Sequence, residues 1–550
     1  MKISVIQQNY IVANFDYNFS KIKKAIIDHH HSDLIIFSEL CITGYYPYDI
    51  LAYPAVIARQ FEVIEKIKVL TEQYNTAVVI GCVMPVDGLK KFYNAALVIE
   101  KGQIVFEYHK QLLPSYSIFD ETRHFIAGEK TSPFFTFKGQ KLALLICEDI
   151  WFDNKQGYLV NPVSELQGKA LDLVISINAS PSMLGKFAQR QQLVSHIADI
   201  AKAPVAYCSQ VGGYDEIVYD GASFVMDKKG QIVALAPSFK EGEIHADLQN
   251  LPQQSFNSPF IDKPYALILQ QLMLGLKDYV HKCGFSGVVV GSSGGIDSAL
   301  TLAIATLALG KENVKAITMP SVYSSKGSVD DSVDLCQRLG VELFQRAIKD
   351  EFLMTCQNFE KAFGHPPKKL TKENMQARIR GRIVMEYSND SGLLMLTTGN
   401  KSELAVGYAT LYGDMCGALN CIGDLYKNDV YALSNYINEA YGELIPRSII
   451  EKAPSAELAE DQKDSDTLPD YYYLDAMLKL YLEHDVLLED EKKQLQEIVD
   501  TVDLTERKRI YRMVELSEFK RKQAPQILIV QRRPFGIGRR MPVTSGFQKT

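Results

Sequence analysis

Several features that identify common classes of protein are missing from this sequence. None of its apolar runs approaches the roughly 18 residues that a membrane-spanning helix needs. The first residues read as a strand and lack the long apolar core of a signal peptide. The nine cysteines are odd in number and scattered, without a C-x-x-C pair, as is typical of thiols in a reducing compartment. We therefore expect a cytoplasmic protein that does not bind a membrane.

An excess of positive charge is missing too. The formal net charge is −7 at pH 7, which argues against a general nucleic-acid binder. The basic residues near the C-terminus (Arg532, Arg533, Arg539 and Arg540) are not interleaved with aromatics, so we interpret this segment as a subunit contact or a substrate lid. With 47% hydrophobic and 23% charged residues, 550 residues predict a globular protein of two or three domains.

The first half of the chain alternates short β-branched runs with amphipathic stretches, which predicts an α/β domain with a sandwich-like number of strands. Strands are predicted at residues 2–7, 34–38, 77–82, 93–100, 142–147, 173–178 and 205–208. Helices are predicted at 17–30 and 54–74. The run His29-His30-His31 could suggest a metal site. Consecutive residues of a helix point in different directions, however, so we interpret it as a solvated helix end.

A change of composition divides the chain. From residue 248 to 259 periodicity stops and Gln, Asn, Ser and Pro dominate, which predicts a linker that we extend to residue 264. We expect one domain over 1–247 and a second over 265–550. In the second, a helix at 266–283 precedes alternating strands and helices, with strands at 285–290, 316–319 and 393–398. This alternation predicts a doubly wound parallel sheet with its ligand at the strand C-termini. From about Glu457 the chain reads as helical and charged.

The most informative segment is a Gly/Ser-rich turn between the strand at 285–290 and a predicted helix at 299–309. Its residues are Gly291, Ser292, Ser293, Gly294, Gly295, Ile296, Asp297 and Ser298. A turn of this kind directs backbone N–H groups and a helix N-terminus at one point, which favours a phosphate. The chain contains no G-x-x-x-x-G-K-[ST] loop, and S-G-G-x-D-S stands in its place. A carboxylate beside a phosphate site indicates that Mg²⁺ bridges the two.

Three polar residues of the first half follow predicted strands: Glu39, Lys110 and Cys147. Strand ends present side chains to a cleft. A thiol needs a base to become a thiolate, a carboxylate can take that proton, and an ammonium can stabilise an oxyanion. Together the three could form a cysteine amidase. Spacing alone does not establish this, because Cys147 could be a core residue, Glu39 a cap and Lys110 a surface charge.

The segments around these residues are more specific. F-S-E-L-C-I-T-G-Y (37–45), H-K-Q-L-L-P (109–114) and I-C-E-D-I-W (146–151) resemble the three signature segments of the nitrilase superfamily. This resemblance implies an αββα sandwich with a Glu-Lys-Cys triad. The loop at 291–298 resembles the pyrophosphate loop of the N-type ATP pyrophosphatases, which split ATP to activate a substrate oxygen.

The order of the two halves is similar to that of the glutamine-dependent NAD⁺ synthetase family. M-P-S-V-Y-S-S-K-G-S (319–328), E-N-M-Q-A-R-I-R-G (373–381) and T-T-G-N-K-S-E (397–403) resemble segments of that family. The resemblance implies that glutamine supplies ammonia, that ATP adenylates deamido-NAD⁺, and that ammonia then displaces AMP. It implies Mg²⁺, a homo-oligomer and an enclosed path for ammonia, since free ammonia is mostly protonated near neutral pH.

The same resemblance implies roles for particular residues. Tyr116, Ser180 and Lys186 would bind glutamine, Thr398 would contact ATP, and Asn374 and Lys520 would contact deamido-NAD⁺. Asp297 and Glu403 would hold Mg²⁺. Glu403 could instead contact the dinucleotide, or only cap a helix with Asn400. Further candidates for phosphate contacts are Arg378, Arg380 and Lys427.

Two other functions compete with this reading. One is a different glutamine amidotransferase with the same loop, such as a GMP- or asparagine-forming synthetase, and the segments at 319–328 and 373–381 argue against it. The other is a binding or assembly protein with a degenerate amidase, which the presence of Glu39, Lys110 and Cys147 makes unfavourable.

Overall fold

The computed structural model describes residues 1–129, 132–152, 157–455, 457–459, 462 and 464–546. The chain forms two compact units. The first consists of Met1–Gly212 with Val218–Lys263, and the second of Pro264–Thr550 with the short excursion Gly213–Ile217. Residues 248–263, between the last strand of the first unit and the first helix of the second, contain neither helix nor strand.

The first unit is built on two six-stranded sheets of mixed direction. One has the order β14-β1-β2-β3-β4-β5: β1 (Lys2–Gln7), β2 (Leu34–Ile36), β3 (Ala77–Pro85), β4 (Phe92–Glu100), β5 (Gln103–His109) and β14 (Gly242–Asp247). The other has the order β13-β12-β9-β8-β7-β6: β6 (Phe134–Phe137), β7 (Gln140–Ile146), β8 (Leu173–Asn178), β9 (Val205–Ser209), β12 (Phe224–Met226) and β13 (Ile232–Leu235). A separate hairpin joins β10 (Val211–Tyr214) to β11 (Ile217–Asp220).

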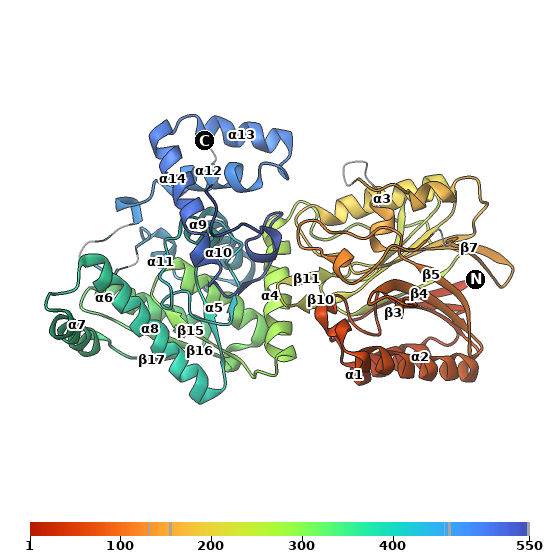
Figure 1. The fold of residues 1–550 in the computed structure, drawn as a ribbon, viewed down its shortest axis with the longest axis horizontal. Coiled ribbons are helices and arrows are strands. Elements are labelled where there is room, and N and C mark those ends of the chain that lie inside the picture. Colours follow the sequence, from red (N-terminus) through yellow and green to blue (C-terminus); the bar gives the residue numbers. More distant parts are fainter. Residues whose placement is uncertain (130–131, 153–156, 456, 460–461, 463, 547–550) are drawn as a thin grey trace. The chain divides into compact units, whose positions relative to one another are not determined.

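Helices cover the outer faces of this pair of sheets (Figure 1). They are α1 (Phe15–Asp28) and α2 (Pro54–Tyr74) on one side and α3 (Lys186–Ala201) on the other. One apolar core, with members such as Val5, Val79, Leu144 and Ile175, joins the two sheets and extends to α3. A second core, including Ile22 and Ile64, lies under α1 and α2. The first unit therefore has the expected αββα arrangement.

Local chemistry explains why several elements begin and end where they do. The α2 helix has Pro54 at its first position and ends at Asn75, whose φ of 48° is left-handed, so its predicted bounds are correct. The β8 strand also forms as predicted, because it pairs in parallel on both sides and is buried throughout. The β2 strand stops at Ile36, two residues earlier than predicted, so Glu39 lies beyond the strand.

The second unit contains one parallel sheet in the order β17-β16-β15-β18-β19-β20, which is the doubly wound order 3-2-1-4-5-6. Its strands are β15 (Val288–Ser292), β16 (Val314–Thr318), β17 (Glu342–Gln345), β18 (Leu394–Thr397), β19 (Leu419–Asn420) and β20 (Gln526–Ile527). The order reverses between β15 and β18. Loops after these two strands therefore diverge, and a crevice is expected at that point.

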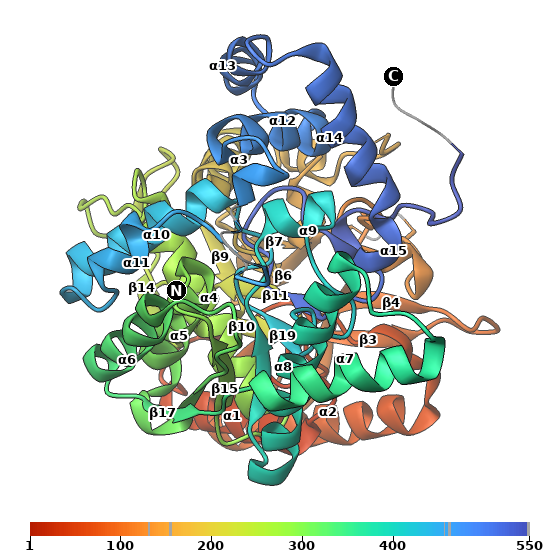
Figure 2. The ribbon, with the colours of Figure 1, turned by 90° about the vertical axis from the view of Figure 1, so that its left-hand side faces the viewer.

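Helices pack on both faces of this sheet (Figure 2). The helices of this unit are α4 (Pro264–Lys282), α5 (Ile296–Leu309), α6 (Lys326–Leu339), α7 (Lys349–Phe363), α8 (Lys369–Ser391), α9 (Lys401–Val406), α10 (Lys427–Tyr441), α11 (Arg447–Glu451), α12 (Tyr471–Glu483), α13 (Glu489–Val499), α14 (Leu504–Leu516) and α15 (Glu518–Arg521). The face that carries Val289 packs against α7 and α8. On the other side α5 contacts the sheet, and α4 and α10 pack against α5.

The boundaries around the Gly/Ser turn differ from the prediction. The β15 strand starts later than expected, and it also ends later because Gly291 and Ser292 pair with Ile317 and Thr318 of β16. Helix α5 begins at Ile296, three residues earlier than predicted. The turn itself is therefore reduced to residues 293–295. Within the described residues, no helix has both the length and the apolarity needed to span a bilayer.

Candidate active sites

In the first unit Glu39, Lys110 and Cys147 all lie where strands end, and all three side chains are buried. Glu39 follows β2, Lys110 follows β5, and Cys147 follows β7. The backbone N–H of Lys110 donates to the carbonyl oxygen of Asn94 at 2.8 Å, which continues the pairing of β5 with β4 for one more residue. The three side chains are thus presented by the ends of both sheets.

Lys110 forms a direct ion pair with Glu39. The Lys110 Nζ lies 2.8 Å from Glu39 Oε1 and 2.7 Å from Glu121 Oε1, and all three side chains are shielded from solvent. Although burial opposes a charge, Glu121 and Glu39 raise the pKa of Lys110 well above its usual value. The group is therefore an ammonium at any physiological pH.

The Glu39 carboxylate is held by further donors. Its Oε1 also accepts from Asn94 Nδ2 at 2.7 Å, and its Oε2 accepts from the backbone N–H of Ala179 at 2.8 Å. Ala179 immediately follows β8, so the carboxylate is fixed between segments from both sheets. A base with a fixed orientation can receive a proton from one defined direction.

Cys147 has an unusual backbone. It begins a short 3₁₀ turn (Cys147–Ile150) with a left-handed φ of 44°, and its residue is only 7% exposed. Such conformations are uncommon for non-glycine residues and occur often at active sites. Burial, followed by the charge of Glu39, raises the pKa of the Cys147 thiol well above its usual value. The resting sulfur is therefore a thiol that needs a base before it can act as a nucleophile.

Asp149 ties the cysteine turn to the lysine segment. Its carboxylate accepts from the backbone N–H groups of Ile146 at 3.0 Å, Gln111 at 3.0 Å and Leu112 at 2.9 Å. Tyr108 also donates to it, at 3.0 Å. One buried carboxylate thereby fixes the relative position of the residues beside Lys110 and Cys147.

The three residues predicted to bind glutamine lie around this centre. The Tyr116 hydroxyl donates to Glu148 Oε1 at 3.0 Å, and Glu148 is the residue after Cys147. Ser180 is buried next to Ala179, and its Oγ accepts from Arg190 Nε at 3.0 Å. Lys186 begins α3, with its Nζ 3.6 Å from the centroid of the Trp151 ring.

Lys186 differs from an ordinary surface lysine. Burial, followed by the positive charge of Arg190, lowers its pKa to about 8. A partly desolvated ammonium of this kind gains much from an anionic partner. Lys186 is accordingly suited to bind the carboxylate of an amino-acid substrate.

Sequence reasoning missed Glu121 and Glu148. Glu121 contacts Lys110, and burial raises the pKa of this carboxyl to about 7. Glu148 receives hydrogen bonds from Tyr116 and, at 2.8 Å, from Tyr158. No periodicity or turn signal marks Glu121, but the position of Glu148 directly after the candidate nucleophile was a usable signal.

In the second unit a cavity opens at the point where the strand order reverses. The loop after β15 and the residues Thr397 and Thr398 at the end of β18 line it. Gly294 has a φ of +74°, and a Cβ at this position would lie 2.2 Å from the carbonyl oxygen of Ser328. Only glycine fits there. No side chain caps the N-terminus of α5 at Gly295, so the helix presents its positive end to the cavity.

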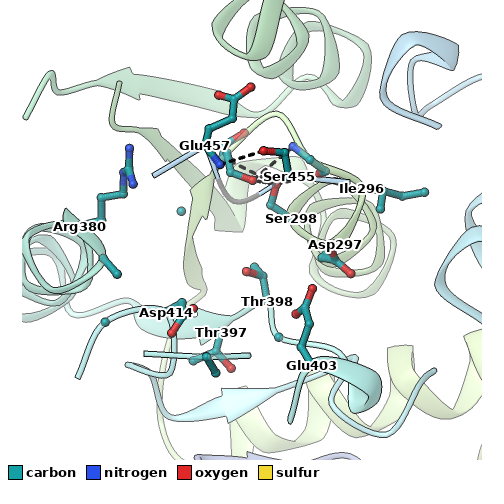
Figure 3. A pocket seen from close by; sticks show the side chains of 18 of the residues that line it. Ile296, Asp297, Ser298, Arg380, Thr397, Thr398, Glu403, Asp414, Ser455 and Glu457 are labelled. Carbon is teal, nitrogen blue, oxygen red and sulfur yellow. Dashed lines mark hydrogen bonds between the residues drawn. The ribbon is translucent and has the colours of Figure 1, made fainter. Parts of the chain in front are cut away.

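Two carboxylates and an ammonium meet on one side of this cavity. Figure 3 shows Asp297 and Glu403 near each other on different elements, with Arg380 across the cavity. Lys427 Nζ lies 2.6 Å from Asp297 Oδ2 and 3.5 Å from Glu403 Oε1. Burial, followed by repulsion from Asp297, raises the pKa of Glu403 to about 8. Carboxylate oxygens are the donors that Mg²⁺ prefers, so this pair fits a divalent cation.

Glu403 also forms the predicted helix cap. The Asn400 side chain accepts from the backbone N–H of Glu403 at 3.0 Å, and Glu403 Oε2 accepts from that of Asn400 at 3.3 Å. The cap leaves Oε1 directed to Lys427. Capping and a role in the cavity are thus compatible. Thr397 Oγ1 is buried without a hydrogen-bond partner among the described residues, which indicates a site for a polar ligand atom.

The other predicted residues of the second unit separate into two groups. Arg380 and Lys427 line the cavity, and burial lowers the pKa of Arg380 to about 10. Among the described lining residues we do not find Asn374, Arg378 or Lys520. Asn374 Oδ1 accepts from Thr410 at 2.8 Å, and Lys520 Nζ donates to the carbonyl oxygens of Gly407 and Ala409, both at 2.7 Å. These two residues instead hold the segment after α9.

Sequence reasoning also missed Lys452 and Asp464, which line the same cavity. Lys452 contacts Ser328 and lies 3.3 Å from Glu457. Burial raises the pKa of Asp464, which lies in the field of Lys427 and Asp297. Lys452 directly follows α11 and Asp464 begins a short 3₁₀ turn before α12, and no local pattern at either position distinguishes a cavity residue from any other.

Comparisons with known proteins cover both units. The carbon-nitrogen hydrolase family matches residues 2–254, and the NAD synthase family matches residues 268–524. The glutamine-dependent NAD(+) synthetase of Synechocystis sp. is 39% identical over 566 residues, covering 99% of both chains. The protein of the same name from Thermotoga maritima is 36% identical over 587 residues, covering 100% of this chain and 99% of its own.

Two solved structures match the chain over nearly its whole length. That of the glutamine-dependent NAD+ synthetase from Acinetobacter baumannii in complex with ADP is 34% identical, with a TM-score of 0.76, and covers 100% of this chain and 99% of its own. The corresponding protein from Cytophaga hutchinsonii is 19% identical with a TM-score of 0.82 and shares the fold.

Proposed function

The chain belongs to the family of glutamine-dependent NAD(+) synthetases, and we propose which of its residues carry out the two halves of that reaction. One half hydrolyses glutamine to glutamate and ammonia. In the other, ATP adenylates deamido-NAD⁺, and ammonia displaces AMP to give NAD⁺. The observation that carries the assignment is the buried Lys110–Glu39 pair, which Asp149 links to the Cys147 turn.

In the glutaminase half, Cys147 Sγ attacks the side-chain amide carbon of glutamine. Glu39 takes the thiol proton and passes it to the departing ammonia, and Lys110 stabilises the oxyanion. While Glu39 carries the proton, Lys110 keeps a counterion, because Glu121 lies 2.7 Å from its Nζ. Water then releases glutamate. Lys186, Ser180 and Tyr116 hold the substrate.

In the synthetase half, the turn at 293–295 and the N-terminus of α5 hold the departing pyrophosphate. Asp297 and Glu403 would hold Mg²⁺, which when bound supplies positive charge to the phosphate oxygens. Thr398 and Arg380, which both line the cavity, contact ATP. Adenylation brings the ATP phosphates close to the carboxylate of deamido-NAD⁺, so the residues that line the cavity must offset this negative charge. We assign deamido-NAD⁺ to the neighbourhood of Asn374 and Lys520, beside the segment after α9.

The setting of the enzyme is also part of the proposal. All nine cysteines are free thiols, which supports a reducing, cytoplasmic environment. Ammonia is mostly protonated near neutral pH and then cannot act as a nucleophile. We therefore propose a homo-oligomer in which an enclosed path carries ammonia between the two active sites. A ratio of about one glutamate released per NAD⁺ formed supports this path, whereas a large excess of glutamate over NAD⁺ contradicts it.

A product assay tests the proposed function. Purified full-length protein is incubated with ATP, Mg²⁺ and either glutamine or ammonium, and with either deamido-NAD⁺ or xanthylate as the acceptor. NAD⁺ should form from deamido-NAD⁺ with both nitrogen sources, and no GMP should form from xanthylate. Formation of GMP, or no NAD⁺ even with abundant ammonium, contradicts the assignment.

A further inference from the structure

Three side chains suited to binding a metal meet in the first unit, apart from the residues used above. They are His29, which ends α1, and Glu243 and His245, which lie two residues apart on β14. Alternate residues of a strand share a face, so the two β14 side chains point the same way. One donor atom from each of the three lies within 4.8 Å of the others, and the described residues contain no second group of this kind.

The donor atoms lie close to one another. Glu243 Oε2 lies 2.8 Å from His29 Nε2, and Glu243 Oε1 lies 3.4 Å from His245 Nε2. The two imidazole centroids are 4.8 Å apart, and their planes are tilted by 45°. Ligands about 2.1 Å from a tetrahedral ion are roughly 3.4 Å from each other. The spacing of the three donors therefore needs little change to accept an ion.

The second ring nitrogen of His245 is already engaged. His245 Nδ1 lies 2.9 Å from Ser4 Oγ, and Ser4 Oγ lies 2.7 Å from Ser32 Oγ. Both serines are buried, and Ser4 stands opposite His245 in the register of β1 with β14. A histidine that binds a metal through one nitrogen is typically oriented by a hydrogen bond at the other. With Nδ1 hydrogen-bonded to the serine pair, Nε2 is the nitrogen of His245 that faces the other two donors.

We propose that His29, Glu243 and His245 form a binding site for a divalent transition-metal ion of the Zn²⁺ class. Two imidazole nitrogens and one carboxylate oxygen match the donors that Zn²⁺ takes, whereas Mg²⁺ and Ca²⁺ prefer oxygen ligands. Water completes the coordination. Glu243 and His245 are exposed, so an ion enters directly from solvent, and His29 provides the buried side of the site.

The site is structural in character. It joins the C-terminal end of α1 to β14, the edge strand of its sheet. None of its residues belongs to the candidate active sites. Bound metal therefore stabilises the first unit without entering the reaction.

The local sequence could not reveal this site. The run His29-His30-His31 alone does not converge on one point, because His30 turns to the carbonyl oxygen of Ile27 at 2.7 Å. The two partners of His29 lie more than two hundred residues further along the chain, and only the pairing of β14 with β1 brings them to the end of α1. The interpretation of the run as a merely solvated helix end is thus incomplete, since His29 is buried.

Metal titration of untagged, full-length protein tests the proposal. The Cys147→Ala background removes the active-site thiol as a competing ligand, and EDTA treatment followed by dialysis removes bound metal. Zn²⁺ binding is measured by calorimetry and Co²⁺ binding by visible absorption. The unfolding temperature is measured with and without Zn²⁺. His245→Gln and Glu243→Gln each remove one donor. The control His30→Gln removes an exposed imidazole from the same helix end.

The parent should bind one Zn²⁺ at this site and show an absorption band with Co²⁺. Its unfolding temperature should rise when Zn²⁺ is added but not when Mg²⁺ is added at the same concentration. Both test variants should lose at least tenfold in affinity, together with the temperature shift and the band. The His30→Gln control should match the parent. Zn²⁺ binding by either test variant at the parent's affinity, or an equal loss in the control, overturns the proposal. Unfolding temperatures without metal, which should agree among all four proteins, show that the losses do not arise from misfolding.

Discussion

The ammonium of Lys427 lies 2.6 Å from the Asp297 carboxylate, at the position where the synthetase half would hold a cation. Asn400 Nδ2 donates to the other oxygen of Asp297 at 2.9 Å. Although burial opposes a charge on Lys427, Asp297 and Glu403 raise its pKa above the usual value. An internal cation thus offsets the negative charge of this pair of carboxylates within the chain itself.

Replacing Lys427 should make the second unit dependent on Mg²⁺. Lys427→Met leaves two neighbouring carboxylates without their cation, and we expect the free energy of unfolding to fall by about 1–3 kcal/mol in EDTA. Added Mg²⁺ should restore more stability in the variant than in the parent. Denaturant unfolding with and without Mg²⁺ measures this, with Lys493→Met on the exposed side of α13 as control. Equal Mg²⁺ responses in parent and variant would count against the pairing.

The turn after β15 should tolerate no side chain at Gly294. Gly294→Ala combines a left-handed φ with a clash against the carbonyl oxygen of Ser328, so both glutamine-driven and ammonia-driven synthesis should be lost. Gly284→Ala is a matched control, since Gly284 has a φ of +82° and nothing lies within 4 Å of its added Cβ. In the control the free energy of unfolding should fall only by the cost of a left-handed backbone for alanine, about 1–2 kcal/mol, and synthesis should continue at the parent rate. Similar synthesis rates for the two variants would contradict this account of the turn.

Glutamine use should weaken at alkaline pH because of Lys186. Its pKa is lowered to about 8, so the ammonium is present below pH 8 and is lost as the pH rises through that value. The KM for glutamine should therefore rise above about pH 8, while the KM for ammonia as nitrogen source should not rise in parallel. Lys186→Met should raise the glutamine KM most below pH 8, and its KM should approach that of the parent as the pH rises above 8.

Lys186→Arg separates this effect from titration of the substrate itself. An arginine stays charged over the whole range, so the rise in KM should shift to higher pH. A pH profile for Lys186→Arg that coincides with the parent's would show that Lys186 does not cause the effect.

Some of this structure is predictable from local sequence, and the reason is physical. Helix α2 forms at the predicted residues because the proline at its start and the left-handed asparagine at its end are local signals. Strand β8 forms as predicted because a continuous apolar run marks it. Parallel pairing sets the end of β15, and the sequence of β15 alone does not contain that information. The alternation of strands and helices in the second half predicts the doubly wound fold, and the resemblance of three segments in the first half implies the nitrilase-like fold.

The candidate sites show the same limit. Resemblance selected Glu39 and Lys110, which the structure brings into contact, and their catalytic roles stay predictions. Glu121 was not predictable, because nothing local to it indicates that it reaches Lys110. Asn374 accepts from the Thr410 hydroxyl and Lys520 donates to backbone carbonyls, and neither is among the described residues that line the cavity, a distinction that only the packing after α9 reveals.

The central claim is that one chain separates nitrogen release at Cys147 from nucleotide activation in the second unit. The most direct test compares NAD⁺ formation from glutamine and from ammonium in Cys147→Ala, with Cys208→Ala as a control that removes another buried thiol of the same unit. Cys147→Ala should lose glutamine-driven synthesis and keep ammonia-driven synthesis close to the parent rate, and Cys208→Ala should keep both. Loss of both activities in a folded Cys147→Ala protein, or retention of glutamine-driven synthesis, would contradict the account.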